Sequence, residues 1–286
     1  MWRFPELDAA GIGESVEDVI VNATQKPRTA QVNGPLWGER ARDWADIQEG
    51  TCKPVYLAAF ERMGLREGMT YLDAGCGAGM ALQIAAGRGA RVSGVDAAAN
   101  LLAIARERVP TGDIHQGELE SLPFADHAFD RVTGFNSFQY AGNPAVALGE
   151  ARRVAKAGAE VVVMTWGEPE GMQAASLVAA LKPLLPPPPP GAPGPFAMSA
   201  EPALRAFATA AGLEVLDVFD VASPWHYPDL PTALRGLRSS GVAARAIAHA
   251  GESAVDAAHS DALAPFRQTD GSFRIGANFR CLRARA

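Results

Sequence analysis

Cysteine is scarce in this chain, and long apolar segments are missing. Its 286 residues include only Cys52, Cys76 and Cys281, which are odd in number, far apart and without CxxC spacing. This pattern excludes a disulfide framework and a zinc ribbon, and it fits a reducing compartment. No apolar run reaches the roughly 18 residues that a transmembrane helix needs. The sequence therefore predicts a cytoplasmic protein with no metal site and no membrane partner.

An excess of basic residues is also lacking. Lys and Arg number 26 against 32 Asp and Glu, a net charge of −6. This balance argues against general electrostatic binding to the phosphates of nucleic acids. The first eight residues carry acids and no apolar core, so they do not read as a secretory signal. With 48% hydrophobic and 20% charged residues, the composition is that of an ordinary globular protein.

Short β-rich runs alternate with helical stretches between residues 65 and 170. Alternation of this kind predicts crossover units and a parallel sheet with helices packed on it. The expected strands are Thr70–Ala74, Arg91–Asp96, Asp113–Gln116, Arg131–Phe135 and Glu160–Trp166.

Two later helices have recognisable ends. Asn143 is a capping residue and Pro144 suits the first helical position, so a helix is expected over 144–157, followed by Gly158. Ser199 is expected to cap a second helix that ends near Ala211.

The C-terminal third is less regular. Prolines 186–190 lack N–H groups and have a fixed φ, which predicts a stiff surface connection. Strands are expected at Glu214–Val221 and Ser272–Arg283. The Ala-rich stretch 230–265 between them is expected to be helical and to form a lid that lines part of an acceptor pocket.

The most informative stretch is 71–79, Tyr-Leu-Asp-Ala-Gly-Cys-Gly-Ala-Gly, at a predicted strand-to-helix turn. Alternate glycines let the backbone turn tightly and approach a ligand closely. A dinucleotide fingerprint requires glycine where this chain has Met80. Asp73 near the strand end would repel a pyrophosphate, whereas it suits a ligand that bears an ammonium group.

Acidic residues follow the next two strands. Asp96 ends the second strand, where a carboxylate accepts hydrogen bonds from both ribose hydroxyls. After the third strand, Glu118 is suited to an exocyclic adenine amine and Leu119 to the ring face, although Glu118 and Glu120 also fit a solvated acidic turn. The site is thus predicted to hold a nucleoside.

These motifs resemble the class I S-adenosylmethionine-dependent methyltransferases, in particular the small-molecule branch that is similar to the ubiquinone and menaquinone biosynthesis enzymes. The resemblance covers about 65–170. It implies a Rossmann-like α/β fold, a mostly parallel seven-stranded sheet with helices on both faces, and S-adenosyl-L-methionine as cofactor. This chain has Glu118 where the family commonly has Asp. Carried over by position, the implied cofactor-binding residues are Asp73, Gly75, Cys76, Gly77, Asp96, Ala97, Glu118, Leu119 and Asn136.

The resemblance also implies how the rest of the chain is divided. It implies a methyltransferase domain over 36–286, with a substrate and lid region at about 183–270, and it leaves 1–35 as an irregular N-terminal arm. Trp37 and Trp44 resemble the family's N-terminal helix over the cofactor pocket, and Trp44 is assigned to cofactor binding; ordinary packing is the alternative.

The expected activity is methyl transfer from S-adenosylmethionine to a small organic acceptor, with specialised metabolism as the expected setting. Because the sulfonium is already activated, positioning makes a specialised base optional. His226 is the candidate base, against a packed or solvated histidine, with Tyr140 and Tyr227 as rivals. Two alternatives stay open: a regulatory protein that binds S-adenosylmethionine without methylation, and a nucleotide-dependent oxidoreductase.

Overall fold

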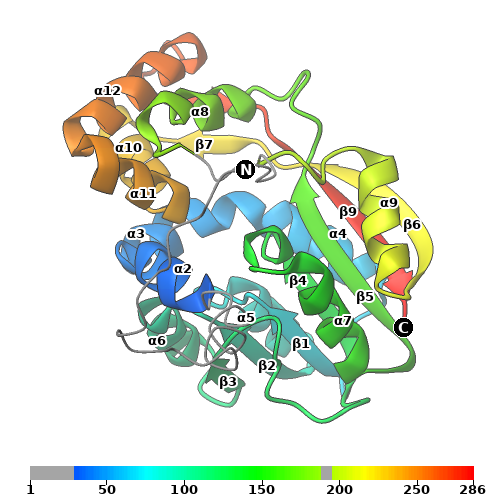
Figure 1. Cartoon of the computed structure of the whole chain (residues 1–286). Helices are drawn as coiled ribbons and strands as arrows, with labels where there is room; N and C mark the ends of the chain where they lie inside the picture. Colours follow the sequence, from blue (N-terminus) through cyan, green and yellow to red (C-terminus); the bar gives the residue numbers. More distant parts are fainter. Residues whose placement is uncertain (1–28, 188–194) are drawn as a thin grey trace, which may run out of the picture.

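The computed structural model describes residues 29–187 and 195–286, and their centre is one seven-stranded sheet (Figure 1). The strand order is β3-β2-β1-β4-β5-β9-β6, and all pairs are parallel except those of β9 with β5 and β6. The strands are β1 (Thr70–Ala74), β2 (Arg91–Asp96), β3 (Asp113–Gln116), β4 (Phe129–Phe135), β5 (Ala155–Trp166), β6 (Glu214–Ala222) and β9 (Asn278–Arg285).

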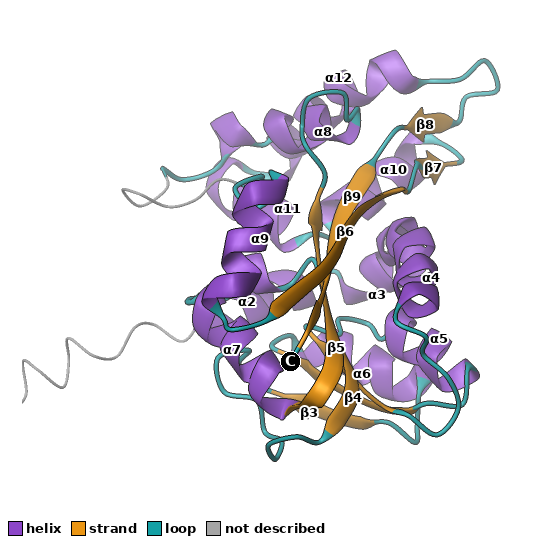
Figure 2. Cartoon of the chain, turned by 90° about the vertical axis from the view of Figure 1, so that its right-hand side faces the viewer, coloured by secondary structure: helices purple, strands orange, loops and turns teal. Residues whose placement is uncertain are grey.

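Helices cover both faces of this sheet (Figure 2). On one face lie α4 (Lys53–Arg62), α5 (Met80–Gly87) and α6 (Ala99–Arg108), which bury Phe60 and Leu82. On the other lie α7 (Pro144–Val154) and α9 (Glu201–Ala210), which bury Leu148 and Leu204. The predicted doubly covered, mostly parallel sheet is confirmed.

Two further groups of elements stand at the carboxyl ends of the parallel strands. The first is an N-terminal wall, α2 (Thr29–Gly38), α3 (Ala41–Asp43), the π-helix η1 (Trp44–Gln48) and the 3₁₀ turn η2 (Glu49–Cys52). The second is a helical block that packs beside this wall, with α11 against α2 and α10 against η1 (Figure 1). It comprises α8 (Ala174–Ala180), η4 (Lys182–Leu184), β7 (Trp225–Tyr227), α10 (Leu230–Arg238), α11 (Gly241–Ala250), α12 (Glu252–Leu263), η5 (Ala264–Phe266) and β8 (Phe273–Ile275).

Several expected boundaries need correction. The Asn143 side chain does accept a hydrogen bond from Val146 N, which confirms the cap, but the helix ends at Val154 because β5 begins at the next residue. Ser199 does not cap α9, because the N-cap residue of this helix is Ala200. The Ser199 hydroxyl is buried without a hydrogen-bond partner.

The final expected strand is divided in two. β8 pairs with β7 in a separate small sheet, and β9 enters the main sheet after Gly276 and Ala277. Within the expected N-terminal arm, residues 29–35 are helical, and residues 1–28 lie outside the described part of the chain, as do residues 188–190 of the proline run. In the described ranges, no helix is long and apolar enough to cross a membrane.

Candidate functional site

A cavity lies where the chain leaves the first four parallel strands. Its floor comes from Gly75 and Gly77 after β1, from the loops after β2 and β3, and from the turn after β4; the N-terminal wall forms its side. Among the described residues that line it, three are acidic and none is basic. The lining comprises Ala30, Asn33, Trp37, Trp44, Cys52, Tyr56, Gly75, Gly77, Asp96, Ala97, Leu101, Gly117, Glu118, Leu119, Glu120, Phe135, Asn136, Ser137, Tyr140 and Ala141.

The glycine loop after β1 favours glycine at Gly75 and Gly77, which both have a positive φ. Gly75 has φ +85°, and a Cβ there would lie 2.3 Å from Ser137 Cβ. Gly77 has φ +53°, and a Cβ there would stand 3.7 Å from the Trp44 indole nitrogen. A larger side chain at Gly77 would therefore enter the space between the loop and the wall.

Most N–H groups of this loop are already used inside the protein. Those of Gly75 and Cys76 donate to Val95 O, and that of Gly79 donates to Cys76 O at 2.9 Å. The N–H groups of Gly77 and Met80 donate to the side chains of Asp96 and Glu49, at 2.9 and 3.0 Å. The loop is therefore not an open anion cradle of the kind that binds a pyrophosphate.

Asp96 is held in place by two backbone donors. Its Oδ2 accepts from Gly77 N and its Oδ1 from Ala98 N, at 2.9 and 2.8 Å. Burial raises the pKa of this carboxyl, while the hydrogen bonds oppose the rise. Asp96 and Ala97 both line the cavity, and the two hydrogen bonds fix the orientation of the Asp96 carboxylate.

Asp73 lies behind the loop and is not a lining residue. Its side chain is 2% exposed and its Oδ1 accepts from the Thr133 hydroxyl at 2.7 Å. Burial raises the pKa of Asp73 to about 7, and the nearby carboxylates of Asp96 and Glu49 add to the rise. Any action of Asp73 on a ligand is thus through its charge.

Cys76 is a correction to the predicted contacts. Its side chain is 4% exposed and packs in the core near Gly94 and Leu82, away from the cavity lining. The Cys76 side chain therefore contributes to the core and not to the described cavity lining.

The two acids after β3 have different partners. Glu118 Oε2 accepts from Ala30 N in the first turn of α2, at 3.2 Å. Glu120 Oε1 accepts from Asn143 N at 2.9 Å, while its Oε2 is buried without a partner. Both are half-buried and line the cavity together with Leu119, so their side chains face more than bulk solvent. The unpaired oxygen of Glu120 was not expected from the sequence.

Aromatic side chains from several elements also line the cavity. Trp37 makes edge contacts with Trp44 and Tyr140, with ring centroids 5.0 and 5.4 Å apart. Tyr56 and Phe135 pack at 4.6 Å. All five rings line the cavity, so the expected position of Trp37 and Trp44 over the pocket agrees with the structure. Asn136, which also lines it, has φ +55° and accepts a hydrogen bond from the Gln139 side chain.

The tyrosine hydroxyls and the Cys52 thiol that line the cavity are protonated near neutral pH. Burial raises the pKa of Tyr140 to about 12, although a hydrogen bond with the Trp166 side chain opposes the rise. Burial likewise raises the pKa of Cys52 to about 12 and that of Tyr56 well above 10. Tyr140 is therefore suited to donate a hydrogen bond and not to accept a proton.

His226 is not part of the cavity, contrary to the expectation of a base. It is the exposed middle residue of β7, while its neighbours Trp225 and Tyr227 point into the core. The buried Tyr227 hydroxyl donates to Gln48 Oε1 at 2.7 Å and does not line the cavity either. Strand alternation thus directs the imidazole away from the site.

The stretch 230–265 also differs from the prediction. It is helical, yet no described residue in it lines the cavity. It supports the wall from behind, where Gly241 packs on the Trp37 ring and Arg235 pairs with Asp43 at 2.5 Å. The helices therefore act as a buttress.

Three residues in or beside the cavity were not predicted from the sequence, namely Glu49, Cys52 and Tyr56. None belongs to a local motif. Cys52 and Tyr56 line the cavity, and Glu49 accepts a hydrogen bond from Met80 N just after the glycine loop. The described residues contain no group of three or more His, Cys, Asp and Glu side chains that could hold a metal ion.

Known proteins share this domain. Residues 72–163 match the methyltransferase domain family. The demethylmenaquinone methyltransferase of Bacillus velezensis is 36% identical over 148 residues, 49% of this chain and 59% of the relative. The malonyl-[acyl-carrier protein] O-methyltransferase of Erwinia pyrifoliae is 38% identical over 97 residues, 34% of this chain and 37% of the relative. The chain thus spans about half the length of the curated relatives it matches.

A solved structure extends the comparison beyond the family match. The [4+2]-cyclase SpnF has a TM-score of 0.52 and 23% identity, covering 81% of this chain and 79% of that protein. At this identity the similarity concerns the fold alone.

Proposed function

We propose, from the premise that residues 72–163 form a class I S-adenosylmethionine-dependent methyltransferase domain, that the protein transfers a methyl group from S-adenosylmethionine to a small organic acceptor. The observation that carries this proposal is the chemistry of the cavity: acidic side chains, a glycine loop that leaves room for a ligand, and no basic residue among the described lining. This donor set fits a nucleoside that bears a sulfonium and an ammonium group.

The same observation weakens the oxidoreductase alternative. A dinucleotide brings a pyrophosphate to the glycine loop. Here the N–H groups of Gly77 and Met80 are bonded to Asp96 and Glu49, which place negative charge at that loop.

The roles we propose follow the placement of the side chains. Asp96 holds the ribose hydroxyls, and Glu118 and Leu119 contact the adenine. Gly75 and Gly77 make room for the methionyl part, while Asn136 lies beside it. When bound, S-adenosylmethionine supplies an activated methyl group.

The acceptor is proposed to be uncharged and aromatic or apolar. The aromatic part of the cavity lining presents Trp37, Tyr56, Phe135 and Tyr140, and no basic residue is among the described lining residues. Because Tyr140 stays protonated at neutral pH, catalysis is proposed to rest on positioning, with Tyr140 as a hydrogen-bond donor. The acidic cavity also disfavours nucleic acid, and three buried free thiols suit the cytoplasm.

Two measurements test the proposal. S-adenosylhomocysteine, without added metal, is expected to raise the melting temperature of the protein, whereas NADH and NADPH are expected to leave it unchanged. Incubation with methyl-labelled S-adenosylmethionine and a panel of uncharged aromatic acceptors is expected to yield a product heavier by one methyl group. Stabilisation by a nicotinamide nucleotide alone would favour the oxidoreductase. Binding of S-adenosylhomocysteine without a labelled product, from the acceptor panel or from added metabolite extracts, would favour the non-methylating alternative.

Ligand affinity is expected to depend on pH through Asp73. Its raised pKa of about 7 means that it loses its proton near neutrality, and the carboxylate favours a ligand with an ammonium group. Affinity for S-adenosylhomocysteine should therefore rise from pH 5.5 to 8, by up to about tenfold per pH unit below pH 7. Calorimetry on wild type and Asp73→Asn checks this, because the asparagine variant should give a flatter profile. An unchanged profile in the folded variant would assign the dependence to another group.

A further inference from the structure

A largely buried ion pair lies beside the glycine loop. Glu49 on η2 is 3% exposed and pairs with Arg108, the last residue of α6, whose side chain is 18% exposed. The other carboxylate oxygen of Glu49 accepts from Met80 N at 3.0 Å, at the first residue of α5. One side chain from the wall thus contacts both the helix after the loop and a cation from the sheet domain.

Arg108 contacts the same two parts of the molecule. Its Nη1 also donates to Ala78 O in the glycine loop at 2.9 Å, and its Nη2 donates to Ala45 O in η1 at 2.8 Å. A guanidinium can make these contacts together because its N–H groups form a rigid fork, which a lysine ammonium lacks.

The segment held in this way carries cavity residues. Residues 44–52 form a π-helix followed by a 3₁₀ turn, and both Trp44 at its start and Cys52 at its end line the cavity. π-Helical turns are rare in proteins, and those that occur are often found at functional sites. The position of Trp44 over Gly77 therefore depends on how this segment is fixed to the loop.

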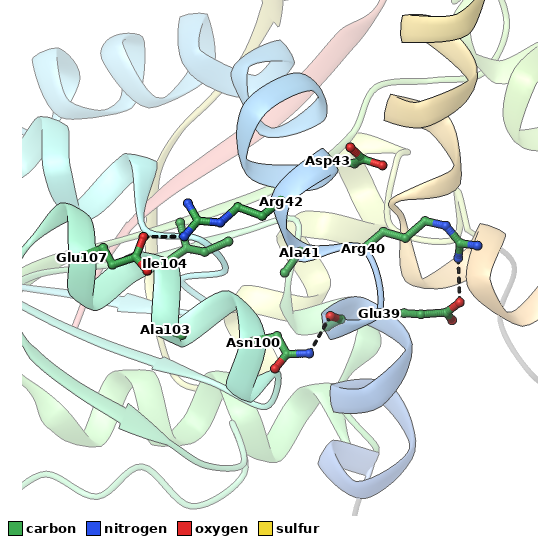
Figure 3. A pocket seen from close by; sticks show the side chains of 10 residues that line it. Glu39, Arg40, Ala41, Arg42, Asp43, Asn100, Ala103, Ile104 and Glu107 are labelled. Atoms are coloured by element: carbon green, nitrogen blue, oxygen red, sulfur yellow. Dashed lines mark hydrogen bonds and ion pairs between the residues drawn. The ribbon is translucent and has the colours of Figure 1, made fainter.

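Stability alone does not explain a pair of this kind. Burying two charges costs desolvation, so a buried ion pair is weak evidence for a stabilising role. An exposed pair, Arg42 with Glu107 at 2.6 Å, already joins the wall to α6 on the outer surface (Figure 3). Its side chains are about 60% exposed, and neither residue lines the cavity.

We propose that Glu49 and Arg108 are positioning residues that fix the wall segment 44–52 to the glycine loop and so set the gap that the cofactor enters. This inference rests on the proposed function, since it assigns a role to residues that support the same cavity. The pair acts through Trp44 and the loop and does not itself line the cavity.

The test compares Glu49→Gln and Arg108→Lys with Arg42→Gln as the matched control. Each protein is measured for its S-adenosylhomocysteine dissociation constant and, without ligand, for the indole N–H resonance of Trp44, assigned by its loss in Trp44→Phe. Glu49→Gln is expected to weaken binding at least tenfold and to shift the Trp44 resonance. Arg108→Lys keeps the charge but loses the fork, so a smaller change in the same direction is expected. Arg42→Gln should change neither quantity.

A purely structural pair would lower the melting temperature and leave both readouts of the folded variants at wild-type values, which would overturn the inference. If Glu49→Gln does not fold, Arg108→Lys decides. Wild-type protein that fails to bind S-adenosylhomocysteine would contradict the proposed function, while the Trp44 resonance of the unliganded variants would still test the positioning role.

Discussion

Replacing Asp96 with alanine is expected to weaken S-adenosylhomocysteine binding by roughly 10²–10⁴-fold. The carboxylate is proposed to accept two hydrogen bonds from the ribose, each worth about 1.5–3 kcal/mol when one partner is charged. Together they amount to about 3–6 kcal/mol, which corresponds to that loss of affinity. The loop is expected to loosen as well, because Gly77 N and Ala98 N lose their acceptor. Calorimetry measures the change.

Asp113→Ala is the matched control for this experiment. Asp113 begins the neighbouring strand β3, is exposed, and pairs with His115 on the surface away from the cavity lining. Its replacement should leave the dissociation constant unchanged. Wild-type affinity in a folded Asp96→Ala protein would remove Asp96 from the ribose site.

Gly77→Leu is expected to abolish measurable binding while the sheet stays folded. The leucine side chain would extend from the loop toward Trp44, into the space proposed for the ligand. The positive φ of +53° adds a backbone penalty of about 1–3 kcal/mol. Circular dichroism reports the fold, and calorimetry reports the binding.

The variant Gly64→Leu distinguishes the cost of the backbone angle from the effect of filling the cavity. Gly64 has a closely similar φ of +59°, is exposed, and has no atom within 4 Å of an added Cβ. It should lose comparable stability and bind as wild type does. If Gly77→Leu binds as tightly as Gly64→Leu, the loop does not approach the ligand.

Much of the sheet domain was predictable because its signals are local. The strands β1, β2 and β3 begin and end where the apolar runs and glycines indicate. Parallel strands bring their carboxyl ends to one edge, so acids after successive strands converge whatever the details of packing. The proximity of Asp96 to the glycine loop and of Glu118 to the cavity follows from this order alone.

Tertiary structure decided what lies opposite that edge. Glu49 and Tyr56 belong to no sequence motif. The position of His226 after a strand suggested a site residue, but the direction of its side chain depends on which face of β7 packs inward. The stretch 230–265 has helical composition, but composition does not specify which surface a helix covers. The sequence by itself determined the sheet and the acids that end its strands, through local turns and periodicity; the wall, its buried ion pair and the buttress behind it depend on contacts between residues far apart in the chain, which no local pattern records.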